Sequence, residues 1–338
     1  MTFSHVPSSS TIRLAKIKLF LERMGLEYSS DVELFVIAQK EDAIVACGGI
    51  VGRVLKNIAI DETVQGEGIA LSLMSELLKI AYADGREELF LFTKPQYEEV
   101  FEACGFKLID GAADKVILME NRYNIEAYKT KLHKLRHSGE VVGSIVMNCN
   151  PFTLGHRYLV EQACARSFWV HLFVVKEDAS FFSFKDRYRL ICEGLAHLKN
   201  LTIHEGSDYI ISKATFPTYF IKDKKQIDSL FTELDLNIFR NHLAPELGIT
   251  HRFVGMEPLC VVTNEYNQQM KKILSRSSTS PSIEVVELER IEYMGEPISA
   301  SRVRRLMQEK NVEEIRHLVP PTTYALIEKM LSTDEDKK

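Results

Sequence analysis

The sequence predicts an α/β protein made of two domains, an α+β domain followed by a doubly wound parallel sheet. Three observations lead to this prediction. The chain has 338 residues, more than one hydrophobic core usually holds. In its first third, three strand-like stretches follow one another with no helix between them, which is typical of antiparallel pairing. From residue 141 onward, short apolar stretches alternate with helix patterns, which is typical of parallel strands.

The first domain is predicted to cover residues 1–122. An amphipathic helix over 12–26 opens it, with Gly25 as a glycine stop. The spacing of the apolar residues predicts the later elements. These are strands at 32–38, 44–50, 54–60, 89–93 and 116–119, and helices at 71–81 and 97–104. A charged helix at 124–137 follows, and residues 123–139 are the predicted linker.

The second domain is predicted to cover residues 140–331. Its first element, 141–147, is short and fully apolar, as buried strands are. Helices at 155–166 and 187–198 then alternate with strands at 169–175, 201–204, 253–255 and 283–288. This order predicts a Rossmann-like sheet. Residues 332–338 are all polar, and we expect a disordered tail there.

Composition excludes several classes of function. The formal net charge of −5 gives no overall basic field, so nucleic acid and anionic membranes are not expected partners. The six cysteines are scattered, with no Cys-x-x-Cys pair, as in reduced cytosolic proteins. Neither a signal peptide nor an apolar stretch long enough to cross a membrane is visible. We therefore expect a cytoplasmic protein.

A first candidate phosphate site lies between the first strand and first helix of the second domain, at Asn150-Pro151-Phe152-Thr153-Leu154-Gly155-His156. Ligands of open α/β sheets bind at this carboxyl end of the strands. The start of a helix offers free backbone N–H groups and a positive dipole end, and both suit phosphate. We expect Gly155 to let the backbone approach the anion, and Thr153 and His156 to donate hydrogen bonds to it.

A second candidate phosphate site is the segment Ile298-Ser299-Ala300-Ser301-Arg302-Val303-Arg304. Ser299 is a good helix N-cap, Ser301 places a hydroxyl in the first turn, and Arg304 follows one turn later. Arginine suits this position because its planar guanidinium can bind two phosphate oxygens at once. Taken alone, the segment favours a capped surface helix with solvated arginines. Together with the first segment, it predicts a paired anion site.

The first segment resembles the His/Thr-x-Gly-His signature of the nucleotidyltransferase superfamily in its threonine variant. The second resembles that family's Ile-Ser-x-(Ser/Thr)-x-x-Arg element, and the two occur in the family's order. This resemblance implies transfer of a nucleotidyl group from ATP, with magnesium, to a phosphate, alcohol or carboxylate. His156, Arg304 and Thr153 are the implied catalytic residues.

The resemblance also implies a nucleotide-binding set from three segments. In the family, the segment after the strand that ends at Gly255 often shapes the adenine or ribose pocket, and Glu257 is a candidate contact for ribose or magnesium. The whole implied set is Asn148, Phe152, Thr153, Gly155, His156, Gly255, Glu257, Ile298, Ser299, Ser301 and Arg304. It assigns no metal ligands, which stay unknown.

In the first domain, a glycine-bearing loop comes directly after a strand and opens a helix, at Gln65-Gly66-Glu67-Gly68-Ile69-Ala70. It resembles the Gln/Arg-x-x-Gly-x-Gly/Ala loop of the GNAT N-acetyltransferases, whose backbone amides bind the pyrophosphate of coenzyme A. Residues 101–106 resemble that family's later helix–strand junction. Gln65, Gly66, Gly68 and Ala70 are therefore the implied ligands of a CoA-like group. The alternative is a degenerate acetyltransferase fold that serves for docking.

The combination of these two domains resembles the citrate lyase ligase family over nearly the whole chain. The resemblance implies that acetate and ATP acetylate a thiol on the acyl carrier subunit of citrate lyase, with release of AMP and pyrophosphate. The thiol belongs to a phosphoribosyl-dephospho-coenzyme A prosthetic group. The second domain then makes acetyl-adenylate and the first holds the CoA-like arm. One departure is Phe182-Ser183-Phe184, where we expect proline between the phenylalanines.

Two other functions stay open from the sequence alone. Pantetheine-phosphate adenylyltransferases share the threonine variant and transfer the adenylyl group to a phosphate ester. The second alternative is a non-catalytic sensor of nucleotide and acyl-CoA, against which the presence of His156 and Arg304 counts. The acetate pocket is not located, although the aromatic stretch 216–220 is a candidate wall.

Overall fold

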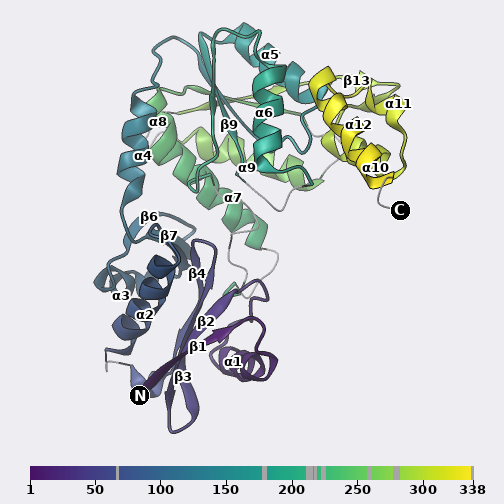
Figure 1. Ribbon diagram of the computed structural model, residues 1–338. Coiled ribbons are helices and arrows are strands. Elements are labelled where there is room, and N and C mark those ends of the chain that lie inside the picture. Colours follow the sequence, from purple (N-terminus) through teal and green to yellow (C-terminus); the bar gives the residue numbers. More distant parts are fainter. Residues whose placement is uncertain are drawn as a thin grey trace. The chain divides into compact units, whose positions relative to one another are not determined.

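The computed structural model describes residues 1–65, 68–176, 181–210, 216, 219–221, 226–256, 261–276 and 282–335 (Figure 1). The chain forms two compact units. The first combines Met1–Lys129 with Thr215–Ile238, and the second combines Thr130–Ala214 with Phe239–Lys338. We predict a continuous second domain over 140–331, and the structure differs by giving Thr215–Ile238 to the first unit.

The first unit is built on a seven-stranded mixed sheet with the order β1-β2-β3-β4-β5-β7-β6. Its strands are β1 (Thr2–Pro7), β2 (Leu34–Lys40), β3 (Ala43–Val51), β4 (Val54–Ile60), β5 (Phe90–Thr93), β6 (Lys107–Ala112) and β7 (Val116–Glu120). Only β4 and β5 pair in parallel, and they do so through two residue pairs, Val54 with Phe90 and Leu55 with Leu91. The two strands are thus joined at their beginnings and not at their carboxyl ends.

Helices cover both faces of this sheet, because alternate residues of a strand point to opposite sides. Phe35 and Ile37 of β2 pack in the cluster that contains α1 (Thr11–Arg23), whereas Val36 and Ala38 pack in the cluster that contains α2 (Ile69–Ala83). Within the described ranges, the other helical elements of the unit are η1 (Glu62–Val64), η2 (Pro95–Tyr97), α3 (Glu98–Ala103) and α7 (Ile227–Ile238). Helix α4 (Asn124–His133) runs from this unit into the second.

The segment that joins the first unit from later in the chain is held by apolar packing. Among its buried side chains are Leu230, Phe231 and Leu234 of α7. The Phe216 ring packs edge-on against Phe92 of β5 at 5.8 Å and against Phe231 at 5.5 Å. The helix also reaches β6, where Asn237 donates a hydrogen bond to the Gly111 carbonyl. This burial explains why the segment leaves the domain that its position in the sequence predicts.

The second unit is built on a five-stranded, fully parallel sheet with the order β10-β9-β8-β11-β12. Its strands are β8 (Val142–Met147), β9 (Trp169–Val174), β10 (Leu201–His204), β11 (His251–Gly255) and β12 (Glu284–Leu288). The chain starts in the middle at β8, adds strands on one side and then crosses to the other. The strand order therefore reverses between β8 and β11, and the predicted doubly wound sheet is confirmed.

Helices and a small hairpin complete the second unit. They are α5 (Leu154–Arg166), α6 (Phe184–Gly194), η4 (Phe239–Leu243), α8 (Ala244–Leu247), α9 (Val261–Leu274), the hairpin β13 (Glu292–Tyr293) and β14 (Glu296–Pro297), α10 (Ala300–Gln308), α11 (Val312–Ile315) and α12 (Pro321–Glu335). The last three helices share a core that includes Val303, Leu306, Ile315 and Ile327. None of the helices within the described ranges is both long and apolar enough to cross a membrane.

Several elements differ from the sequence-based prediction. Strands β1 and β6 and helices α7 and α12 are not predicted. β1 is an edge strand, and of its six residues only Val6 is fully buried, so its hydrophobic pattern is weak. The tail predicted from residue 332 is wrong over its first part, because α12 continues to Glu335. The apolar residues Leu326, Ile327 and Met330, which pack in the C-terminal core, support this extension.

The side chain of Arg302 holds the C-terminal helices together through hydrogen bonds. Its buried guanidinium donates to Glu314 Oε1 at 2.6 and 3.2 Å, to the Tyr293 carbonyl at 2.9 Å and to the Glu296 carbonyl at 3.1 Å. These bonds tie α10 to α11 and to the hairpin. Arginine at this position is thus structural, in contrast to Arg305 on the exposed side of the same helix.

We expect Arg302→Ala to lower the free energy of unfolding by about 2–3 kcal/mol, because a partly buried carboxylate and two carbonyls lose their donor. Urea denaturation measures this. Arg305→Ala is the matched control, and we expect a change below about 0.5 kcal/mol because that side chain is exposed. Equal losses in the two variants would contradict the assignment of Arg302.

Candidate functional site

Three segments meet where the parallel strands of the second unit end. They are the loop and helix start after β8, Gly255 at the end of β11, and the segment from Arg290 to Arg304 that follows β12. We call this group the carboxyl-edge site. It lies beside the reversal of strand order between β8 and β11, which is where open α/β sheets bind their ligands.

The start of α5 is organised by a reciprocal cap between Thr153 and His156. Thr153 Oγ1 accepts a hydrogen bond from the His156 N–H at 3.3 Å, and the Thr153 N–H donates to His156 Nδ1 at 3.1 Å. The Thr153 side chain is fully buried. It therefore holds His156 in place, which differs from the expectation that its hydroxyl contacts phosphate.

The cap determines which ring nitrogen of the neutral His156 carries the proton. Because Nδ1 accepts a hydrogen bond, the proton of the neutral ring lies on Nε2, for which no partner is found in the described part of the chain. Burial, and next the positive charge of Arg290, lower the pKa of His156 to about 4. At neutral pH this side chain is hence an uncharged N–H donor whose orientation is already set.

Phe152 and Gly155 support the site by packing. Phe152 is fully buried, and its ring lies nearly parallel to that of His156, with 6.1 Å between the centroids. Its ring thus supports His156, and the implied contact of Phe152 with a nucleotide stays a prediction. A Cβ on Gly155 would lie 2.6 Å from the Ile298 carbonyl oxygen. Gly155 therefore permits contact with the second motif, and we find no support for its predicted approach to an anion.

The two motifs, far apart in the sequence, are side by side in the structure. Arg304 donates a hydrogen bond to the Asn150 carbonyl, and its other nitrogen donates to Ser301 Oγ at 3.2 Å. Ser299 caps α10 by accepting from the Arg302 N–H at 3.2 Å, as predicted. The predicted helix with a serine cap is therefore present, and Arg304 joins it to the loop after β8.

Asn148 is held by a buried arginine that sequence analysis missed. Arg187 of α6 is fully buried, and it donates to the Asn148 carbonyl at 2.6 Å, to Asn148 Oδ1 at 2.7 Å and to the Val175 carbonyl at 3.0 Å. These acceptors compensate the burial of its charge. In the sequence, Arg187 is one arginine of an amphipathic helix, and only its burial marks it out.

The other residues that the sequence predicts to bind ligands lie in several parts of the structure. Gly255 lies at the carboxyl end of β11, where its carbonyl accepts a hydrogen bond from Asn267. Ile298 is buried in the C-terminal core. Glu257 and Gly66 lie outside the described residues. Gln65 and Gly68 are exposed at the start of α2, with Ala70 in its first turn.

The start of α2 is open in the way that the CoA-binding prediction requires. Gly68 is the N-cap, has a φ of +71°, and provides no capping side chain. A Cβ added to it would meet nothing within 4 Å. The N-cap therefore has no side chain that could cover the first N–H groups of α2. The left-handed backbone at this position favours glycine.

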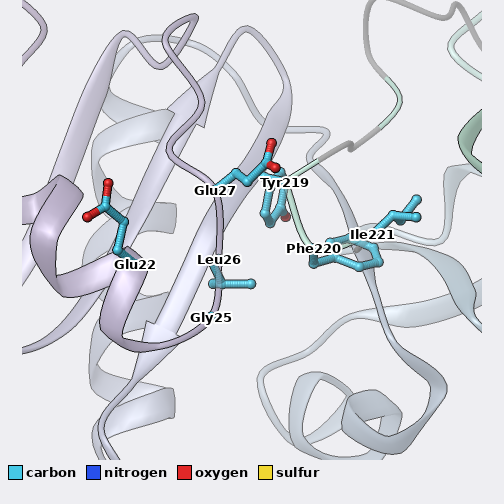
Figure 2. A pocket seen from close by; sticks show the side chains of 7 residues that line it. All are labelled: Glu22, Gly25, Leu26, Glu27, Tyr219, Phe220 and Ile221. Atoms are coloured by element: carbon cyan, nitrogen blue, oxygen red, sulfur yellow. The ribbon is translucent and has the colours of Figure 1, made fainter. Parts of the chain in front are cut away.

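The aromatic stretch 216–220 does not lie in the nucleotide unit. Residues 217–218 are outside the described part of the chain, and Phe216, Tyr219 and Phe220 belong to the first unit. Two of them border a cavity of about 310 Å³ (Figure 2), lined by Glu22, Gly25, Leu26, Glu27, Tyr219, Phe220 and Ile221. Two carboxylates in this wall oppose the binding of acetate, so the structure does not support this stretch as the acetate pocket.

The described residues do not form a magnesium site. Within the described ranges, no group of three His, Cys, Asp or Glu side chains can hold a metal ion. His156 and Arg304, which the two motifs bring to this edge, offer hydrogen-bond donors, whereas magnesium prefers carboxylate and phosphate oxygens.

We expect the His156 imidazole to titrate near pH 4, below the ordinary histidine value of about 6.5, with the proton on Nε2 above that pH. Imidazole ¹⁵N chemical shifts measure both. Because the folded pKa is lowered, the contribution of His156 to stability is complete above pH 6.5 and is lost as the pH falls toward 4. An imidazole protonated at pH 6, or protonated on Nδ1, would contradict the geometry.

Two family models match the chain in the expected order. The model of the acetyltransferase (GNAT) domain matches residues 14–116, and that of the citrate lyase ligase C-terminal domain matches residues 142–327. The first runs from within α1 to the first residue of β7, and the second covers the parallel sheet with the carboxyl-edge site.

Two relatives match over almost their entire length. The citrate (pro-3S)-lyase ligase of Klebsiella pneumoniae is 49% identical, over 95% of this chain and 94% of its own. That of Escherichia coli (strain K12) is 46% identical, over 97% of this chain and 94% of its own. Among solved structures, Thermotoga maritima TmcAL bound with alpha-thio ATP aligns over 57% of this chain and 56% of its own, at 15% identity and a TM-score of 0.36, which is too low to support an argument.

The identity between this chain and the two ligases extends over both domains and over the segments that build the carboxyl-edge site. The chain belongs to the citrate lyase ligase family.

Proposed function

We propose that the carboxyl-edge site activates acetate with ATP, and that the acetyl group then passes to the thiol of a CoA-like group on the acyl carrier subunit of citrate lyase. The observation that carries this proposal is the junction of two capped helix starts, α5 and α10, with the donors His156 and Arg304. The membership in the citrate lyase ligase family supports the choice of acid and acceptor.

In the first step, an acetate oxygen attacks the α-phosphorus of ATP. The bond from that phosphorus to the oxygen that bridges to the β-phosphate breaks, and pyrophosphate leaves with the electron pair. No general base is needed, because acetate is ionised at neutral pH. The protein has to hold the reactants in line and stabilise the charge that develops on pyrophosphate.

The described residues are suited to that task. The neutral His156 offers its Nε2–H, and Arg304 offers a permanent positive charge about one helical turn after Ser301. Thr153 and Phe152 act by positioning His156. We propose Asn148, Gly255, Ile298, Ser299 and Ser301 as further parts of the nucleotide site, with Glu257 as a candidate contact. Magnesium would be brought by the phosphates of ATP.

In the second step, the carrier thiol attacks the acetyl carbon of acetyl-adenylate. A carbon–sulfur bond forms, the thiol proton is lost to solvent, and the bond to the AMP oxygen breaks. We propose that the first unit holds the CoA-like arm during this step through Gln65, Gly66, Gly68 and Ala70. The support is the uncovered start of α2, whose N–H groups suit the pyrophosphate of the arm.

We expect pyrophosphate release from ATP and magnesium to depend on acetate and to rise when thiol-form carrier subunit is added. In His156→Ala the rate should fall by a factor on the order of 10²–10³, because one stabilising donor is lost. His197→Ala is the matched control, since His197 is exposed on the same unit and pairs with Glu161. Release that requires phosphopantetheine in place of acetate would indicate the adenylyltransferase alternative, and no release at all would indicate a sensor.

We expect Gly68→Asp to impair acetylation of the carrier thiol while acetate-dependent pyrophosphate release remains. The new carboxylate would repel the phosphates of the arm. Gly85→Asp, at the other end of α2, is the control with the same charge and a similar φ of +75°. Mass spectrometry of the carrier and a pyrophosphate assay separate the two steps. An equal fall of both activities in Gly68→Asp would contradict the assignment of the two steps to different units.

A further inference from the structure

Helix α6 packs one face against the segment that carries the first motif, although neither motif belongs to this helix. The side chains of Arg187, Leu190 and Ile191 are fully buried, and Gly194 ends the helix. Residues spaced by three, four and seven positions lie on the same face of a helix. Leu190 and Ile191 belong to the core cluster that contains Phe152 of the first motif. The buried face of α6 is therefore part of the support of that motif.

The first specific contact of this face is made by Arg187, which fixes the loop after β8. Its guanidinium donates to the Asn148 carbonyl at 2.6 Å, to Asn148 Oδ1 at 2.7 Å and to the Phe182 carbonyl at 3.2 Å. The Phe182 N–H in turn donates to Asn150 Oδ1 at 3.0 Å. Hydrogen bonds thus join the loop to the start of α6 at both Asn148 and Asn150.

The second contact is made by Gly194, seven residues after Arg187, and it determines where Phe152 lies. A Cβ on Gly194 would lie 2.5 Å from Cε1 and 3.1 Å from Cδ1 of the Phe152 ring. Carbon atoms that are not bonded pack at about 3.5–4.0 Å, so any side chain at 194 has to displace this ring. Phe152 is fully buried and its ring lies nearly parallel to that of His156. Displacement of Phe152 would therefore change the support of His156.

We propose that Arg187 and Gly194 are positioning residues for the activation of acetate. Through them, α6 holds the first motif so that the His156 Nε2–H keeps its direction toward the leaving pyrophosphate. This inference rests on the proposed function, because it concerns the donor assigned there. Arg187 acts through Asn148, and Gly194 acts through Phe152. The direction of the donor matters because a displacement of about 1 Å can lower a rate on the order of 10²-fold.

The main test is Gly194→Ala, with Gly143→Ala as its matched control. A Cβ on Gly143 would also enter a phenylalanine ring, 2.8 Å from Phe253 Cε2, but Gly143 lies near the beginning of β8, at the end of the sheet opposite to the motifs. We expect the urea midpoint to fall in both variants, because both overfill the core. Only Gly194→Ala should also lower kcat for acetate-dependent pyrophosphate release, roughly ten- to hundredfold, with little change in the KM for ATP.

A double-mutant cycle tests whether Gly194 acts through Phe152. Phe152→Leu removes ring atoms that the new Cβ would meet, so Gly194→Ala should lower kcat less in the Phe152→Leu background than in the unchanged protein. The imidazole ¹⁵N chemical shifts of His156 should change in Gly194→Ala and stay unchanged in Gly143→Ala. A loss of stability alone produces neither result.

Arg187→Lys tests the other contact. Lysine keeps the charge, but a single ammonium group does not replace the planar set of donors of a guanidinium. We therefore expect kcat to fall roughly tenfold, together with a change in the ¹⁵N shifts of His156. Arg189→Lys on the same helix is the control and should behave like the unchanged protein, because Arg189 is exposed and pairs with Glu193 at 3.3 Å.

Each outcome decides one part of the inference. Equal kcat in Gly194→Ala and Gly143→Ala, or an undiminished effect of Gly194→Ala in the Phe152→Leu background, would overturn the role of Gly194. Equal kcat in Arg187→Lys and Arg189→Lys would overturn the role of Arg187. In these cases acetate-dependent release by the unchanged protein leaves the proposed function standing. If the unchanged protein shows no such release, both the inference and the proposed function fail.

Discussion

The carboxyl-edge site depends on the close approach of two backbones, that of Gly155 at the start of α5 and that of Ile298 just before α10. A side chain at 155 would lie 2.6 Å from the Ile298 carbonyl oxygen, which is closer than atoms that are not bonded can come. The other links between the motifs need the same approach. They include the bond from Arg304 to the Asn150 carbonyl. The Leu154 N–H also donates to the Leu318 carbonyl, which lies after α11, at 2.9 Å.

The arginines of the second unit fall into two groups with different physical roles. Arg187 and Arg302 are buried, and carbonyl oxygens or Glu314 accept their hydrogen bonds. They hold loops and helices in place and have little capacity left for a ligand. Arg304 and Arg290 are only half-buried. Arg304 bonds to the loop before α5, and the positive charge of Arg290 lowers the pKa of His156. Such a concentration of positive charge and fixed N–H groups at the end of a parallel sheet favours a polyanion.

His156 can act as a donor at neutral pH without carrying a charge. Its orientation comes from Thr153, its support from Phe152, and its neutrality from burial and from Arg290. A donor whose geometry is already set needs no reorganisation when charge develops on a leaving group. Thr153 and Phe152, which the sequence predicts to contact the ligand, thus also hold the His156 side chain in position.

The sequence by itself determined the features that depend on neighbours within a few residues. The strands and helices around the site, the caps at Thr153 and Ser299 and the two-domain α/β class all follow from hydrophobic period and local hydrogen bonding. The two motifs also identified the family, because their residue types and order are specific.

Only the tertiary structure decided which distant residues meet. Gly155 lies against Ile298, Arg304 bonds to the Asn150 carbonyl, Arg187 holds Asn148, and the segment 215–238 joins the first unit. None of these has a local signature, because an arginine or an apolar helix face looks the same in the sequence whether water or a remote strand covers it. The packing of the whole chain, which buries some of these groups and not others, makes that choice.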